Sequence, residues 1–301
     1  MLRYKVIVNP QAAAGRAGRI VPALEKAFRQ HHAIPEIFLT HSKEEATSLA
    51  RDNEGYASVV AVGGDGTINS VVNGLAGQQT PLGIIPAGSV NRIAKSLGIP
   101  SGLSASTDLL LSQDHHPVDL GEVNGAYFLG WLSAGFDAET VRTIEQHPRL
   151  KQITFGRKSL NIPLYLAIGF SSLLRSDFAP KVTTPEAEIS GSLVQVSNFA
   201  HYPGGWKLFP RASPQDGKLD VLIHLDGRLP ALTKTLISSF HGNHLTLRSV
   251  RYLQQEELRI DGHQIPLQAD GEFIGYTPVT VRTHANKIRV LAMLRKCSQR
   301  L

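Results

Sequence analysis

The chain has 301 residues, 42% of them hydrophobic and 19% charged, which excludes a fibrous or low-complexity protein and leaves room for two globular domains. Its one cysteine, Cys297, excludes an intramolecular disulfide and a cysteine-based zinc cluster. The formal charge of +6 favours an anionic partner, and residues 142–181, with seven Lys or Arg against two acids, are the segment expected to meet it.

The first eight residues indicate the cellular compartment in which we expect the protein. Residues 1–8 form a strand-like run that contains charges and lacks the apolar stretch and cleavage site of a signal peptide. We therefore expect a reducing, cytoplasmic location. Nucleic acid is disfavoured as a partner, because the positive charge lacks interleaved aromatic residues and no recognition module is apparent.

The first 117 residues alternate between strand and helix patterns. Strands are expected at 2–8, 34–39 and 58–62, and helices at 19–31, 43–51 and 68–75. The second helix opens with a capping box in which Ser42 accepts from the amide of Glu45 and Glu45 returns the contact. This α/β alternation predicts a doubly wound domain whose parallel strands are covered on both faces and bind ligands at their carboxyl ends.

After Pro117 the pattern changes to strands and turns. Strands are expected at 118–120, 126–132, 187–198, 219–225, 248–260, 264–269 and 278–282. This predicts a second, antiparallel β-rich domain over 118–285, after an α/β domain over 1–117. A final strand-like run at 287–294 is a candidate to return to the first domain, so that 286–301 would complete it.

One apolar helix, at 161–174, interrupts the second domain. It contains Pro163 and is shorter than the ~20 residues that a bilayer requires. We therefore expect a helix that packs on the protein or touches a membrane, rather than one that spans it.

A strand followed by Gly63-Gly64-Asp65-Gly66-Thr67 and a helix has the order that phosphate binding requires. Glycines let backbone amides approach phosphate oxygens, and the helix N-terminus adds partial positive charge. Thr67 can cap the helix, whereas Asp65 should hold magnesium, a donor hydroxyl or a backbone amide, because a carboxylate repels phosphate. The alternative is a plain tight turn in which Asp65 caps the helix.

A second glycine turn follows one strand later, at Gly88-Ser89-Val90-Asn91 after the run 82–86. Two such turns on adjacent strands are expected to face one crevice.

At this point the sequence resembles the diacylglycerol kinase catalytic-domain family, which includes bacterial diacylglycerol kinases, related lipid kinases and sphingosine kinases. The resemblance covers nearly the whole chain, although the first turn alone also occurs in NAD kinases. Its motifs are Asn9-Pro10, the two glycine turns, Asn69, Val71-Val72-Asn73-Gly74, Val118-Asp119-Leu120-Gly121, Gly135-Phe136-Asp137-Ala138, Asp216-Gly217-Lys218-Leu219-Asp220-Val221 and Asp270-Gly271-Glu272.

The resemblance implies a nucleotide domain, a β-rich domain and ATP in the cleft between them. The nucleotide contacts that it implies are Thr40, Gly63, Gly64, Asp65, Gly66, Thr67, Asn69, Gly88, Ser89 and Asn91. From the Asp270-Gly271-Glu272 motif it implies Glu272 as general base and Asp270 as a further catalytic residue, with Asp65 as a rival for the role of base or for the catalytic magnesium. It also implies a structural Mg²⁺ held by the carboxylate of Asp216 and the carbonyls of Ser213 and Lys218. For both Asp-Gly motifs a simple turn is the alternative.

Two departures from the family pattern stand out. The loop from Asn9 to Gly15 lacks the usual serine and places its glycine later, which puts phosphate contacts there in doubt. Asn91 is followed by Arg92, where the family has an acid. This exchanges a donor-orienting or metal-organising group for a phosphate-binding one.

The leading hypothesis is an ATP- and Mg²⁺-dependent kinase of a membrane lipid, such as diacylglycerol or a sphingoid base, that contacts an anionic membrane surface peripherally. One alternative is a nucleotide-binding regulatory protein with reduced or lost catalysis. Another is a kinase of a soluble acceptor such as NAD. A homodimer is left open.

Overall fold

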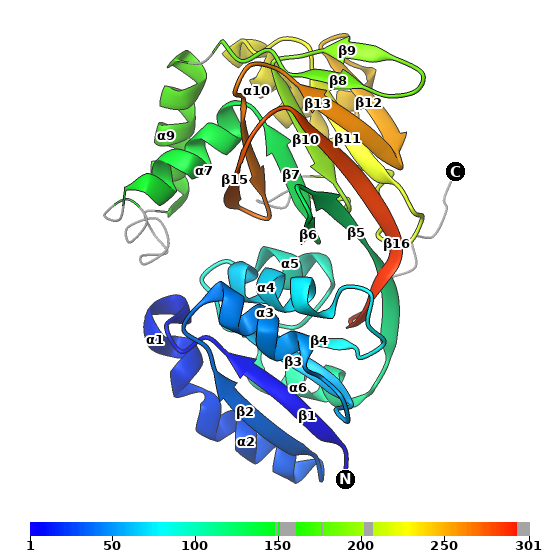
Figure 1. The fold of residues 1–301 in the computed structure, drawn as a ribbon. Helices are drawn as coiled ribbons and strands as arrows, with labels where there is room; N and C mark the ends of the chain where they lie inside the picture. The colour runs from blue at the N-terminus through cyan, green and yellow to red at the C-terminus, as the bar shows by residue number, and fades with distance from the viewer. Residues whose placement is uncertain (148–149, 151–160, 176, 202–206, 294–301) are drawn as a thin grey trace. The chain divides into compact units, whose positions relative to one another are not determined.

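The computed structural model describes residues 1–147, 150, 161–175, 177–201 and 207–293. The chain divides into two compact units, an N-terminal unit of Met1–Val118 with Asn286–Leu301 and a C-terminal unit of Asp119–Ala285 (Figure 1). Cys297 and much of the basic segment 142–181 lie outside the described residues.

Four parallel strands, in the order β2-β1-β3-β4, build the sheet of the N-terminal unit. Their bounds are β1 (Arg3–Val8), β2 (Ile34–Leu39), β3 (Ser58–Gly63) and β4 (Leu82–Pro86). Near the end of β16 (Val279–Leu291), Val290 pairs in parallel with Leu82. The strands β3 and β4 are buried throughout, as expected of parallel strands covered on both faces.

Helices cover both faces of this sheet (Figure 1). They are α1 (Ala12–Arg19), α2 (Val21–Gln30), α3 (Lys43–Arg51), α4 (Asp65–Leu75), α5 (Arg92–Ser96) and α6 (Leu103–Leu111). α3 packs against α4, and α2 packs against α6. Along β1, Val6 and Val8 share a core with Leu24 of α2, whereas Nζ of Lys5 reaches Asp52 after α3. The predicted doubly wound domain is therefore confirmed.

Two local expectations need adjustment here. Ser42 caps α3 by accepting from the amide of Glu45 (3.1 Å), as predicted, but the carboxylate of Glu45 accepts from the amide of His41 (2.7 Å). Residues 12–18, expected as a loop, form most of the irregular helix α1. Because its backbone departs from helical geometry in the middle, α1 is not the regular helix that a sequence pattern predicts.

The C-terminal unit is built on antiparallel strands, as predicted. One sheet has the order β12-β11-β10-β7-β14-β15, and β16, β13, β8 and β9 form an antiparallel series to which β5 and β6 are attached. The bounds are β5 (His115–Val123), β6 (Ala126–Phe128), β7 (Trp131–Ala134), β8 (Lys181–Thr183), β9 (Glu188–Ser190), β10 (Leu193–Ser197), β11 (Leu219–His224), β12 (Val250–Gln255), β13 (Glu257–Asp261), β14 (Pro266–Ala269) and β15 (Glu272–Tyr276). Leu132 and Leu267 of the first sheet share a buried core with Leu258 and Val281 of the second series.

Several predicted strands are divided in the structure. The run 126–132 becomes β6 and β7, 187–198 becomes β9 and β10, and 248–260 becomes β12 and β13. The break between β6 and β7, at Leu129 and Gly130, results from a buried carboxylate that binds the backbone there. Conversely, the runs 278–282 and 287–294 belong largely to the single strand β16.

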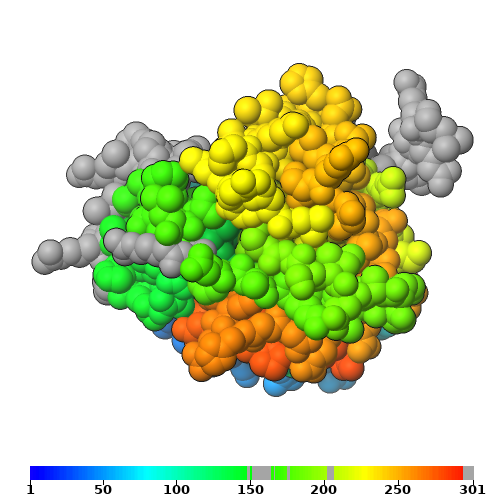
Figure 2. Space-filling model, turned by 90° about the horizontal axis from the view of Figure 1, so that it is seen from above, coloured from blue at the N-terminus to red at the C-terminus, as the bar shows by residue number. Residues whose placement is uncertain are grey.

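The prediction of only one helix in the second domain is wrong. Besides α9 (Asn161–Arg175), the described residues contain α7 (Phe136–Gln146), α10 (Leu229–Phe240) and the short 3-10 helix η1 (His244–Thr246). Acidic residues in the first turn of α7 and a proline at the start of α10 are the local signals that were present. α10, yellow in Figure 2, exposes Leu229, Ile237 and Phe240. Across the described part of the chain, no helix has both the length and the apolarity needed to cross a bilayer.

Candidate nucleotide and phosphoryl-transfer site

The chain segments that leave β1, β3 and β4 meet at the carboxyl edge of the parallel sheet. The amide of Asn9 donates to the carbonyl of Val62 (3.1 Å), and the amide of Ala87 donates to the carbonyl of Gly63 (2.8 Å). Nη2 of Arg16 donates to the carbonyl of Gly88 (3.0 Å). Three loops, far apart in sequence, thus form one region within the N-terminal unit.

The direction in which the chain leaves each strand changes in this region. After β1 the chain enters α1 and α2, and α2 packs with α6 on one face, whereas after β3 it enters α4, which packs with α3 on the other face. Neighbouring strands whose following helices diverge in this way mark the switch point at which doubly wound sheets bind ligands. Here that point lies between β1 and β3, beside the first glycine turn.

The two glycine turns, expected to face one crevice, touch each other directly. A Cβ atom built on Gly88 would lie 2.4 Å from Cα of Gly64, and one built on Gly63 would lie 2.4 Å from Oγ1 of Thr67. Only hydrogen at these positions allows the backbones to pack so closely. Gly64 is the N-cap of α4 and has no side chain, so the first-turn amides face the region as a positive helix end. Thr67 lies inside α4, and its predicted capping role is wrong.

We expect Gly88→Ala to weaken ATP binding at least about tenfold, because the added methyl group forces the two turns apart. Calorimetric titration with ATP measures the effect. Gly102→Ala is the matched control, since no atom lies within 4 Å of a Cβ there. Wild-type affinity in Gly88→Ala would contradict the assignment of the turns to phosphate binding.

Asp65 joins the two turns. Its carboxylate accepts from the amides of Arg92 (3.1 Å) and Ile93 (3.0 Å), which begin α5, and from Nε of Arg92 (3.3 Å). Of the three partners expected for Asp65, the backbone amide is the one found. Since both oxygens are engaged and a guanidinium lies beside them, this arrangement disfavours Asp65 as a general base or magnesium ligand.

The other predicted nucleotide residues take different places. Asn91 clamps the second turn, because its side chain accepts from the amide of Gly88 (2.8 Å) and donates to its carbonyl (3.1 Å). Ser89 lies half-buried in that turn. Asn69, in α4, accepts from Nδ2 of Asn73 through its carbonyl and Oδ1. Thr40 follows β2, and its buried hydroxyl donates to the carbonyl of Ser42 (2.8 Å).

The first loop carries backbone strain and an unexpected cation. Ala13, Ala14 and Gly15 have φ values of 50°, 56° and 83°. The left-handed conformation costs an alanine roughly 1–2 kcal/mol, and such strain tends to persist where a loop serves a ligand. Arg16 follows directly and reaches Gly88, so a guanidinium lies beside the touching turns. Motif comparison missed Arg16, although a basic residue in a glycine-bearing loop was a visible signal.

In the C-terminal unit, Asp270 and Gly271 form the two-residue turn between β14 and β15. Their φ values of 49° and 88° are those of a type I′ hairpin, with Ala269 opposite Glu272. The hairpin alternative is therefore correct for Asp270 and Gly271. It does not exclude catalysis by Glu272, which lies outside the turn as the first, half-buried residue of β15.

The carboxylate of Asp270 is buried and binds backbone. It accepts from the amides of Leu129 (2.8 Å), Gly130 (2.9 Å) and Trp131 (2.9 Å). Three backbone amides thus donate to a carboxylate that is only 4% exposed. This geometry makes Asp270 a residue that fixes the turn before Glu272, rather than one that exchanges protons with a substrate.

The predicted metal loop contains two neighbouring carboxylates. Asp216 accepts from the amide of Lys218 (3.1 Å), and Asp119 accepts from the amide of Gly217 (2.7 Å). Burial raises the pKa of Asp216, and the nearby charge of Asp119 raises it further. A divalent cation would relieve this repulsion, so the loop fits Mg²⁺. The described residues hold no cluster of three His, Cys, Asp or Glu side chains, so carbonyls such as that of Ser213 would have to supply further ligands.

Asp220, in the same motif, is buried in β11. Tyr252 and Nε2 of Gln254 (3.2 Å) donate to its Oδ1, while its Oδ2 has no hydrogen-bond partner. Burial therefore raises the pKa of Asp220 to about 6, from an ordinary value of 3.8.

The raised pKa of Asp220 should make the folded protein less stable as the pH rises. Because its folded-state pKa is raised, its contribution is complete below about pH 4 and is lost as the pH rises through about 6. The free energy of unfolding of Asp220→Asn, relative to wild type, should therefore rise by up to about 3 kcal/mol from pH 4 to pH 7. Urea denaturation measures the free energy of unfolding of both proteins. If the difference between them did not vary with pH, the raised pKa of Asp220 would be contradicted.

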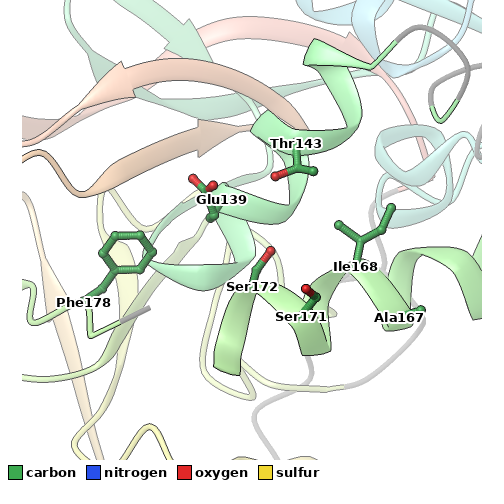
Figure 3. Close-up of a pocket in the computed structure, with 7 residues that line it drawn as sticks. All are labelled: Glu139, Thr143, Ala167, Ile168, Ser171, Ser172 and Phe178. Atoms are coloured by element: carbon green, nitrogen blue, oxygen red, sulfur yellow. The ribbon is translucent and has the colours of Figure 1, made fainter. Parts of the chain in front are cut away.

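A cavity of about 360 Å³ lies between α7 and α9 (Figure 3). Hydroxyl-bearing and apolar side chains line it together with one carboxylate: Glu139, Thr143, Ala167, Ile168, Ser171, Ser172 and Phe178. Its size falls within the range of small-molecule sites, and its mixed lining suits a ligand with polar and apolar parts. This cavity could not be predicted from the sequence, because α7 was not predicted.

Comparison with known proteins shows what this chain is similar to. The model of the Diacylglycerol kinase catalytic domain matches residues 3–123, and that of the YegS C-terminal NAD kinase beta sandwich-like domain matches residues 130–292. A diacylglycerol kinase from Staphylococcus haemolyticus (strain JCSC1435) is 30% identical over 289 residues, which cover 91% of this chain and 83% of that protein.

Two solved structures share the fold. A putative diacylglycerol kinase from Bacillus anthracis str. Sterne matches with a TM-score of 0.78 and 22% identity, over 97% of this chain and 95% of that one. An NAD kinase from Archaeoglobus fulgidus, solved in complex with ATP, matches with a TM-score of 0.55 and 12% identity, over 96% and 93%. At these identities the likeness concerns the fold alone.

Proposed function

Since the chain belongs to the diacylglycerol kinase catalytic-domain family, a family of ATP-using kinases, we propose that it transfers the γ-phosphoryl group of ATP to a hydroxyl of a lipid such as diacylglycerol or a sphingoid base. The main support for ATP binding is the contact between Gly64 and Gly88 at the switch point of the sheet. An NAD kinase with this fold has been solved in complex with ATP, which is consistent with a nucleotide-binding fold.

In the N-terminal unit, the start of α4 and the guanidinium of Arg16 would hold the phosphates of ATP. The ion pair with Arg92 neutralises Asp65, so its carboxylate does not repel them. Asp216 and the carbonyls of Ser213 and Lys218 would hold Mg²⁺. When bound, this ion would offset the negative charges of Asp216 and its neighbour Asp119 and so fix their loop.

In the C-terminal unit, Glu272 would act as general base. The lipid oxygen attacks the γ-phosphorus, the bond between that phosphorus and the β,γ-bridging oxygen breaks, and ADP leaves. The hydroxyl proton passes to the carboxylate of Glu272. Asp270 supports this step by fixing the turn from which Glu272 projects.

A lipid acceptor is favoured by apolar side chains that face solvent on two helices. Phe170 and Leu174 of α9 are exposed, as are Ile237 and Phe240 of α10. Groups of this kind suit contact with a membrane surface. We propose that the protein acts in the cytoplasm and touches an anionic bilayer peripherally, with the basic segment 142–181 contributing charge.

One observation favours a second candidate function. Arg92 stands where the family has an acid and pairs with Asp65 at the nucleotide site. A regulatory protein that binds ATP without turnover would tolerate this exchange.

Radiolabelled ATP with liposomes of diacylglycerol, sphingoid base, ceramide or phosphatidylglycerol tests the proposal. We expect one lipid class to become labelled. ATP binding without labelling of any class would instead favour the regulatory protein.

A further inference from the structure

The proposed chemistry leaves the motif Gly135-Phe136-Asp137-Ala138 without a role. Asp137 is buried in the first turn of α7, and two hydroxyl groups donate to its carboxylate. Oγ of Ser133 donates to Oδ2 (3.0 Å), and the phenol of Tyr165 donates to Oδ1 (2.8 Å). Asp137 therefore binds α9, through Tyr165, to the end of β7.

A chain of hydrogen bonds continues from Ser133 to the turn before Glu272. Nε2 of Gln268 donates to Oγ of Ser133 (2.8 Å), and Oε1 of Gln268 accepts from the amide of Gly271 (2.8 Å). Ser133 and Gln268 are direct partners in the pairing of β7 with β14. Four hydrogen bonds thus connect Tyr165 on α9 with the backbone of the Asp270-Gly271 turn.

The direction of every bond in this chain is determined. A backbone amide can only donate, so the carbonyl oxygen of Gln268 must face Gly271 and its NH₂ group must face Ser133. The hydroxyl of Ser133 then accepts from Gln268 and donates its hydrogen bond to Asp137. The donors point toward Asp137 from both sides, and the N-terminal end of α7 favours a carboxylate there.

Burial makes this chain stiff. Gln268, Ser133 and Asp137 are buried, so each bond lies in a low dielectric and a broken bond leaves a polar group without water to replace the partner. The two ends of the chain, at Tyr165 and Gly271, are half-buried. A displacement of α9 would therefore be passed to the turn rather than absorbed by solvent.

We propose that Asp137 is a positioning residue that couples the seating of α9 on α7 to the orientation of Glu272. A lipid that enters the cavity between these helices (Figure 3) changes how Tyr165 meets Asp137, and Gln268 transmits the change to Gly271. The inference rests on the proposed role of Glu272. It assigns to α9 a part in turnover, beyond any contact with the bilayer.

Tyr165→Phe tests the coupling, because it removes one hydroxyl at the accessible end of the chain. We expect kcat for lipid phosphorylation to fall about tenfold, as a misplaced reacting group costs rate, while KM for ATP stays within about twofold. Tyr127→Phe, which removes a tyrosine hydroxyl elsewhere in the same unit, is the control and should retain wild-type kcat. Combining Tyr165→Phe with Asp137→Asn should lower kcat no further than the worse single variant.

Amide hydrogen exchange at Gly271, followed by NMR, tests the coupling without activity. We expect exchange to be at least about threefold faster in Tyr165→Phe than in wild type and unchanged in Tyr127→Phe. If wild type labels no lipid but Gly271 responds, the proposed function fails and the mechanical link stands. Unchanged kcat together with unchanged exchange in Tyr165→Phe would overturn the inference.

Discussion

Glu272→Gln is expected to lower kcat for lipid phosphorylation about a thousandfold, because general-base catalysis typically contributes 10²–10⁴-fold. The substitution keeps the size of the side chain and its place at the start of β15, but the amide cannot accept a proton. KM for ATP should stay within about twofold, because the proposed phosphate contacts come from the turns at Gly63 and Gly88. Steady-state kinetics on lipid vesicles measures both parameters.

The control for this variant is Glu256→Gln, which changes an exposed carboxylate between β12 and β13. It should leave kcat and KM at wild-type values. If Glu272→Gln retained more than about a tenth of the wild-type kcat, Glu272 would not be the base, and Asp65 would return as the candidate despite its bonds to α5.

Asp270→Asn is expected to have the largest effect on stability, about 3 kcal/mol, with a loss of activity that follows from it. The carboxylate serves three amides, and an asparagine placed in the same pocket turns an NH₂ group toward at least one of them. Asparagine is the most informative replacement, because it tolerates the left-handed backbone that Asp270 adopts. Urea denaturation of the whole chain measures the loss.

Asp177→Asn, at an exposed position of the same unit, provides the comparison for Asp270→Asn and should change stability by less than about 0.5 kcal/mol. A variant Asp270→Asn as stable as wild type would show that the buried bonds to Leu129, Gly130 and Trp131 contribute little. The role of Asp270 in fixing the turn would then be untenable.

Features set by local sequence could be predicted. The two glycine turns, the parallel strands before them and the capping serine of α3 each depend on residues close in the chain. Hydrophobic runs and turn residues are sufficient signals for such features. The neighbourhood of the two turns could be predicted because adjacent parallel strands end at the same edge of a sheet, whereas the direct contact of Gly64 with Gly88 was not predicted.

Features set by distant contacts could not be predicted. Asp65 binds amides more than 25 residues away, so no local pattern distinguished a backbone partner from a magnesium ion. Leu129 and Gly130 read as part of a strand, because nothing nearby reveals that Asp270 will bind their amides. Likewise, the chain from Tyr165 to Gly271 links residues brought together only by the fold.

Arg92 shows both the strength and the limit of motif comparison. Its departure from the family pattern was visible, and a phosphate-binding guanidinium was the interpretation. In the structure, Nε of Arg92 donates to the carboxylate of Asp65. The exchange of an acid for Arg92 therefore also engages the Asp65 carboxylate at the nucleotide site. Its effect on turnover therefore depends on whether Asp65 takes part in the reaction.

The central claim is that the phosphoryl group goes from ATP to a lipid hydroxyl. The most direct test is one reaction that contains radiolabelled ATP, NAD and vesicles of anionic phospholipid with diacylglycerol and a sphingoid base. We expect label to enter a lipid, NAD to stay unlabelled, and Glu272→Gln to lower the transfer about a thousandfold. Label in NAD with none in any lipid would contradict it.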